Sequence, residues 1–317
     1  SCMTTQAIPQ TEAHATYGGT SGTVFDIGYQ RYTGRREGRG RSRLAVFKDG
    51  FRTALGFGRG ARAKVLPWFF IGVLTAIALV MAIVAGAAER IGGPGTAAEA
   101  GLPSHSDYYG IASILLFVFA AIVAPELLCP DRRNRVLSLY LVRPMSGSDY
   151  IVSRWSAFLV VMLATAWLPQ IILFLGLSMG DPVPMTYLQK HWLDVPRFLA
   201  AGAAMATYAT TLAMLVASFT SRRAYASVFL VGLFVITAPF TIGLAQELDG
   251  APGQWISMFD LANIPVHVND VIFGDVSEMT EHAPARELGA RMLVIWYFIW
   301  TLVPGAILWW RYRRLSP

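Results

Sequence analysis

The residues of this 317-residue chain that could do chemistry are few, and they do not form a hydrolytic or nucleotide-binding motif. The segment 58–64 (G-R-G-A-R-A-K) is glycine-rich and basic, but it lacks the second glycine directly before the lysine of a phosphate-binding loop. No H-E-x-x-H occurs, and no serine-protease elbow is matched by a histidine in another apolar run. We therefore expect no catalytic residue and no ATP hydrolysis by this chain alone.

Metal-binding side chains are equally sparse, because all five histidines lie outside the apolar runs described below. His267 and Asp270 have i, i+3 spacing and could share a metal, but an outer-surface pair with solvent partners is favoured over so small a ligand set. Cys2 and Cys129 are too few for a disulfide framework or a cysteine-based metal site. The sequence predicts no metal and no cofactor in this chain.

Composition points to a membrane protein, since 54% of the residues are apolar and only 15% are charged, against about 25% charged in soluble proteins. A helix needs about 20 residues to cross a bilayer. Uncharged runs of this order predict an all-α membrane protein with six transmembrane helices, at 66–88, 110–129, 155–178, 198–219, 225–245 and 291–310.

Positive charge predicts how these helices are oriented, because Lys and Arg are retained in short cytoplasmic loops. Of the 26 Lys and Arg, all but Arg90, Lys190, Arg197, Arg286 and Arg291 lie before residue 65 or in 130–154, 222–223 and 311–314. Both termini are therefore expected in the cytoplasm. Residues 1–43 read as a disordered basic tail, which we expect to contact anionic lipid headgroups rather than nucleic acid.

Two segments outside the spans have helical apolar periodicity. In 44–58, apolar residues recur at three- and four-residue spacing with Lys48 and Arg52 beside them, which predicts an amphipathic surface helix or a simple membrane anchor. Domain 44–317 begins with this helix. In 247–287, two short extracytoplasmic helices, broken at 263–265, are expected to lie in the outer leaflet.

The longest predicted cytoplasmic loop, 130–154, carries both charge and apolar surface. Asp131 could cap a helix whose outer turns hold Arg132 and Arg133. Its apolar residues either fold back on the spans or dock on another protein; they are Val136, Leu137, Tyr140 and Leu141. Glu126, at the end of the second span, is either functional or paired with Arg132 or Arg133.

Polar side chains inside the spans mark a possible substrate path. Gln170, Tyr208, Thr211 and Thr237 could line a cavity, although close packing of helices explains such residues more often.

The region 126–154 resembles the membrane subunit of an ABC-2 type transporter. It has an acidic residue at the end of the second span, a charge cluster, L-S-L-Y-L at 137–141, R-P-M-S at 143–146 and D-Y at 149–150. The order of surface helix, spans and loops resembles that family over 44–310. The sequence departs from the commoner pattern, which has a glutamate-glycine step in the cluster and a lysine where Arg154 stands.

The resemblance implies a bacterial inner-membrane permease that exports a hydrophobic or amphipathic molecule. It implies a coupling helix at 131–141 that docks on a separate ABC ATPase, with ATP and Mg on two copies of that subunit. A second permease copy or a sibling permease is expected as a partner. Alternatives are lipid export, cofactor maturation or a non-transporting membrane scaffold that recruits a cytoplasmic partner. An intramembrane enzyme is disfavoured because the spans lack an ionisable pair.

The topology can be tested with single cysteines at Ser146, Asp181, Ser221 and Ser277, in a chain without its two native cysteines. An impermeant thiol reagent applied from the cytoplasmic side should label the first and third positions only, because six crossings place the others outside. Labelling of Ser146→Cys and Ser277→Cys from the same side would contradict the topology.

Overall fold

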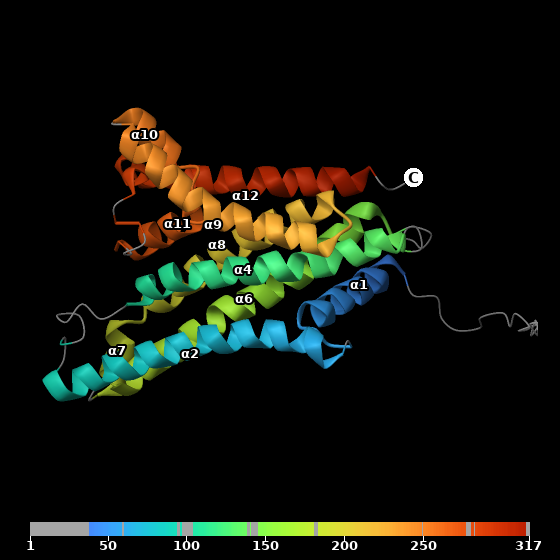
Figure 1. Cartoon of the computed structure of the whole chain (residues 1–317). Helices are drawn as coiled ribbons and strands as arrows, with labels where there is room; N and C mark the ends of the chain where they lie inside the picture. Colours follow the sequence, from blue (N-terminus) through green and yellow to red (C-terminus); the bar gives the residue numbers. More distant parts are fainter. Residues whose placement is uncertain are drawn as a thin grey trace, which may run out of the picture. The chain divides into compact units, whose positions relative to one another are not determined.

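The computed structural model describes residues 38–58, 60–93, 96, 104–137, 140, 145–180, 183–248, 250–276, 280–281 and 283–314. Every regular element in these ranges is helical (Figure 1). Residues 1–37, which make up most of the predicted basic tail, lie outside the described part of the chain.

Six helices are long and apolar enough to cross a membrane, which confirms the predicted number. They are α2 (Ala61–Gly92), α4 (His105–Arg133), α6 (Gly147–Gly180), α8 (Asp194–Phe219), α9 (Arg223–Glu247) and α12 (Ala290–Arg313). The fold is that of a multi-pass membrane protein. Most of these helices extend several residues beyond the predicted apolar runs. At the start of α4, Ser104 and Asp107 form a reciprocal capping box.

Helix α1 (Arg39–Ala54) begins five residues before the predicted start at Leu44, so residues 39–43 belong to the helix and not to the tail. It also ends earlier, because residues 55–58 form a turn. Its buried residues are Val46, Gly50 and Ala54, whereas Leu44, the first apolar residue of the predicted helix, is 41% exposed. This buried face packs against α6, so α1 is held by protein contacts.

Short helices connect the long ones at the opposite end from α1 (Figure 1). They are α7 (Pro184–Lys190), which the sequence analysis did not single out, α10 (Ala251–Ser257), α11 (Ile264–Phe273) and the 3₁₀ helix η1 (Pro284–Leu288). The break between α10 and α11 falls at residues 258–263, slightly earlier than predicted. Pro265 lies in the first turn of α11, where its missing N–H leaves no helical bond unmade.

The six long helices alternate in direction, so the chain returns repeatedly to the same two ends. One end holds α1, the C-termini of α4 and α12, the N-terminus of α6 and the link between α8 and α9 (Figure 1). We call it the arginine-rich end. α4 and α8 are the most buried of the six, and α9 and α12 are the least.

Small residues bring α2 and α6 into backbone contact. A Cβ added at Gly176 would lie 2.5 Å from the Cβ of Ala82, and one added at Gly180 would lie 2.5 Å from the Cα of Gly86. Ala82 and Gly86 are four residues apart on α2, and Gly176 and Gly180 are four residues apart on α6. Small residues at this spacing let helices in a membrane approach closely. This contact fixes α2 against α6, and Arg90 of α2 adds hydrogen bonds to the carbonyls of Met179 at 2.7 Å and of Gly180 at 3.4 Å.

The substitution Gly176→Val should therefore lower the free energy of unfolding by about 1–3 kcal/mol, because the added methyl groups overpack the contact. Thermal unfolding of the purified protein in detergent measures the effect. Gly72→Val on α2 is the matched control, since a Cβ at Gly72 meets nothing within 4 Å. Equal loss of stability in both variants would show that intrinsic helix propensity, and not the contact, decides.

Candidate functional site

Arg154 lies at the centre of an ion network at the arginine-rich end. Its side chain projects from the first turns of α6 and is 3% exposed. Nη1 forms an ion pair with Oδ2 of Asp49 in α1 at 2.8 Å, and Nη2 donates to Oδ2 of Asp131 in the last turn of α4 at 2.8 Å. A buried guanidinium needs such partners, because an unpaired buried charge costs several kcal/mol. The network therefore holds α1 and the end of α4 against α6.

Tyr150 extends this network to α12. Its hydroxyl donates to Oδ2 of Asp131 at 2.6 Å, one turn before Arg154 on the same helix. Its ring stacks on Tyr312 with the ring centroids 5.8 Å apart, and it lies 5.7 Å from the ring of Tyr140 in the loop that follows α4. One side chain thus touches the loop, the end of α4 and the C-terminal turn of α12.

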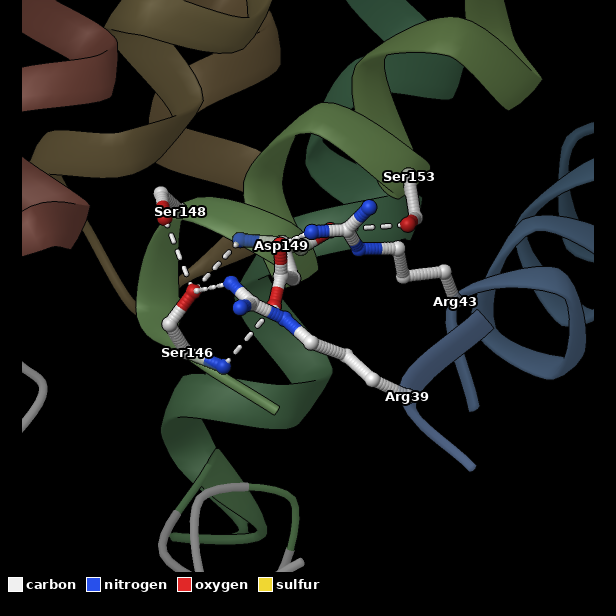
Figure 2. Close-up of polar contacts among 6 residues, drawn as sticks. All are labelled: Arg39, Arg43, Ser146, Ser148, Asp149 and Ser153. Atoms are coloured by element: carbon white, nitrogen blue, oxygen red, sulfur yellow. Dashed lines mark hydrogen bonds and ion pairs between the residues drawn. The ribbon is translucent and has the colours of Figure 1, made fainter. Parts of the chain in front are cut away.

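A second ion cluster joins α1 to the N-terminus of α6 (Figure 2). Asp149 is 6% exposed and accepts from Arg39 Nε at 2.6 Å and from Arg43 Nη2 at 2.5 Å. Its Oδ2 also accepts from the backbone N–H of Ser146 at 3.1 Å, while the Ser146 hydroxyl accepts from the backbone N–H of Asp149 at 3.3 Å. This reciprocal pair is a capping box. The hydrogen bond to Asp149 raises the pKa of Arg39, so the guanidinium is charged at any physiological pH.

Glu126 makes a third ionic link at this end. Its Oε2 pairs with Nη1 of Arg223 at 2.6 Å, which joins α4 to the first residue of α9. Its predicted partners were Arg132 and Arg133, and Arg223 was not among them. Ionic contacts therefore connect three of the six long helices, α4, α6 and α9, and the shorter helix α1 at one end of the bundle.

The predicted role of Asp131 as a helix N-cap is wrong. α4 continues through Pro130 and ends at Arg133, so Asp131 lies in its last turn. The carboxylate binds Tyr150 and Arg154 and is not available to cap a new helix. Arg135 follows with a positive φ of 54°, a left-handed conformation that cannot continue the right-handed helix.

The remaining predicted docking residues divide into exposed and packed groups. Arg133 is exposed, whereas Arg132 and Val136 are half-buried. Leu137 and Tyr140 are half-buried and pack against the hydrophobic core of this chain. For these two residues the structure supports folding back on the spans. Leu141 lies outside the described residues.

The four predicted substrate-path residues do not converge on one cavity. Gln170 is fully buried, where its amide donates to the carbonyl of His105 at 2.9 Å. Tyr208 is also buried and donates to the carbonyl of Leu261 at 2.9 Å. Thr211 lines a cavity of about 530 Å³ between α6, α8 and α12. Thr237 lines a different cavity of about 420 Å³ between α9, α10 and α12.

Two expectations about histidines are wrong. His105 lies in the first turn of α4, a spanning helix, and is buried against Gln170. His267 and Asp270 are also buried, so they are not a solvated surface pair. Burial, with a smaller effect of Arg286, lowers the pKa of His267 to about 4. Among the described residues, no group of three metal-binding side chains occurs.

A G-x-S-x-G string is present at Gly176–Gly180, where the sequence analysis assigned no function. It lies within α6 and not at a strand-to-helix turn, and Ser178 donates to the carbonyl of Leu175. The glycines serve the contact with α2, so the string is not a nucleophile elbow.

The chain matches no protein-family model and no curated protein. The candidate site therefore stands on its geometry alone.

Sequence reasoning missed Asp49 and Tyr312 and assigned no role to Asp149, Tyr150 or Arg154, although these three fell within the quoted motif. The available signal for Asp49 was its sign, because it is the one acidic residue in the otherwise basic stretch 38–64. No periodicity marks Tyr312, because its partner lies on another helix.

The substitution Arg154→Gln should lower the free energy of unfolding by about 3–5 kcal/mol, because it leaves Asp131 without its buried cation. Arg197→Gln is the control. Arg197 pairs with Asp194 at an exposed position, where such a pair contributes about 1 kcal/mol or less. Thermal unfolding in detergent compares the two, and similar losses would contradict a special role for the buried network.

Proposed function

We propose that this chain is the membrane-spanning permease subunit of an ABC transporter, and that it exports a hydrophobic or amphipathic molecule with ATP hydrolysed by a separate subunit. The observation that carries the proposal is the construction of the loop after α4. The end of α4, where this loop begins, is locked to α1, α6 and α12 by Asp131, Tyr150 and Arg154, while residues 133–135, which we call the tip, are exposed.

Such a loop can act as a coupling element. A partner that moves the exposed tip displaces Asp131, and the buried ion pair passes the displacement to α6 and α1, because an unpaired buried charge is strongly disfavoured. Stacked Tyr150 and Tyr312 carry it to α12. In this proposal the tip docks on a cytoplasmic ABC ATPase, two copies of which bind ATP and Mg.

The proposed orientation in the membrane follows from the charges at the arginine-rich end. We place the arginine-rich end and both termini in the cytoplasm of a bacterial cell, with the chain in the inner membrane, because Lys and Arg mark cytoplasmic loops. Exposed apolar surface on α9 and α12 is available to lipid and to a second permease copy or a sibling permease. Nucleic acid is not among the proposed partners.

The apolar lining of the two larger cavities supports a hydrophobic or amphipathic substrate. Each cavity adjoins threonine hydroxyls, at Thr211 in one and at Thr237 in the other, with aromatic and aliphatic side chains around them. Lipid export and cofactor maturation are narrower versions of the same function. A membrane scaffold would use the same docking loop without coupled ATP hydrolysis.

The docking prediction uses Arg133→Glu, because this exposed residue can be changed without disturbing the network. Co-purification with an ATPase encoded beside this gene should weaken about tenfold or more, and transport-linked hydrolysis should fall with it. Arg197→Glu, which is exposed at the other end, is the control. Leu137→Ala and Tyr140→Ala should weaken assembly by a larger factor, about 30-fold for a central anchor.

Because Leu137 and Tyr140 also pack on the core of this chain, their variants count only if thermal unfolding is unchanged. If all three variants assemble normally and substitutions in 218–225 prevent assembly with the ATPase, the coupling element is the link between α8 and α9 instead. ATP hydrolysis by the purified chain without a partner would overturn the permease proposal.

A further inference from the structure

At the arginine-rich end, α1 and α6 line an open cavity of about 330 Å³. Its polar wall holds Arg39 and Arg43 of α1 with Ser148, Asp149 and Ser153 of α6. Both arginines are about half-exposed, at 54% and 49% of their side-chain surface, so they face the opening even though each binds Asp149. Figure 2 shows the two guanidinium groups converging on the single carboxylate.

The charge of this cavity is positive. Two arginines and one aspartate line it, so one positive charge is in excess. An anionic group is therefore the charge that complements the wall.

The polar cavity adjoins the apolar cavity of about 530 Å³ between α6, α8 and α12, which we call the groove. Val152 and Trp309 line both of them. The groove runs along these helices away from the arginine-rich end and is walled by side chains such as Trp155, Leu302 and Ala306. Val152 and Trp309 are 53% and 42% exposed, so the junction is open at the side of the bundle.

We infer that this combined site binds an anionic phospholipid, with the headgroup phosphate at Arg39 and Arg43 and an acyl chain in the groove beside Trp309. Arginine pairs with phosphate through two parallel N–H donors. Each guanidinium group has five N–H donors and uses only some of them on Asp149 and Ser146. Tryptophan is enriched at the level of lipid headgroups, where one part of its ring is wet and the other apolar. The inference requires only that the helices span a bilayer, so it does not depend on the transporter proposal.

A bound lipid would contact α1, α6 and α12 together. These are the segments that the Asp149 and Arg154 clusters join, so the lipid adds a bridge that forms only in a membrane with acidic headgroups. Lipid composition would then set how firmly α1 is held at this end.

The test measures lipid binding to the full chain in detergent by native mass spectrometry, with phosphatidylglycerol and phosphatidylcholine of the same acyl chains. Wild type should prefer phosphatidylglycerol. Arg39→Ala and Arg43→Ala should each weaken that binding about fivefold, the equivalent of ~1 kcal/mol for one basic residue near acidic lipid. The double variant Lys48→Ala/Arg52→Ala removes two positive charges from α1 outside the cavity, one more than either single variant, and should still leave the preference intact.

The acyl part is tested with Ala306→Phe, which fills the groove but keeps both arginines. It should weaken binding of long-chain phosphatidylglycerol about tenfold and leave dihexanoyl phosphatidylglycerol unaffected. Equal binding of the two headgroups, or equal losses in the Lys48/Arg52 control, would overturn the site. Competition by millimolar inorganic phosphate would identify a free-phosphate site instead. A change in oligomeric state by Ala306→Phe without a change in lipid binding would assign the groove to a second copy.

Discussion

A buried cation shared by two carboxylates sets the arrangement of the arginine-rich end. The Arg154 guanidinium cannot be left alone in an apolar bundle, so Asp49 and Asp131 must come to it, and with them α1 and the end of α4. Since these carboxylates belong to segments more than 80 residues apart in the chain, a local charge requirement becomes a long-range constraint on topology. The tyrosines around Arg154 then fill the space that the ions leave.

The rest of the bundle is held differently. Away from this end the long helices meet mainly through small and aromatic residues, as in the contact of Gly176 and Gly180 with α2 and the stacked rings of Phe117 and Phe234, whose centroids are 4.5 Å apart. Buried hydrogen bonds, such as that of Gln170 with His105, add to these contacts. The geometry of the arginine-rich end therefore depends on charge, and that of the rest of the bundle depends mainly on packing.

The number of spanning helices could be predicted because it depends only on the length of apolar runs, which is a property of neighbouring residues. Helix ends were less predictable. α4 was expected to stop before Pro130, yet it continues to Arg133. The two partners that the carboxylate of Asp131 gains by staying helical offset the helical hydrogen bond that Pro130 cannot make. Propensity favoured a cap at this residue, and a tertiary ion pair overrode it.

The candidate site was harder to predict from the sequence, because tertiary contacts decide it as well. Asp149, Tyr150 and Arg154 attract notice in the sequence as charged or aromatic residues next to an apolar run, but their partners lie on other helices and no spacing connects them. The polar residues chosen for a substrate path illustrate the limit from the other side. Gln170, Tyr208, Thr211 and Thr237 share a chemical character, but their directions depend on helix rotation, and rotation is set by the packing of all six helices.

The backbone contact between Gly86 and Gly180 restricts which sequences can replace this one. At the neighbouring pair, an enlarged residue at position 176 can in principle be offset by Ala82→Gly, since a methyl group remains there to be removed. At positions 86 and 180 both partners are already the smallest residue, so neither can yield to the other. A larger residue at one of these two positions therefore cannot be compensated by a smaller residue at the other. It can be accommodated only if α2 and α6 move apart along their whole line of contact.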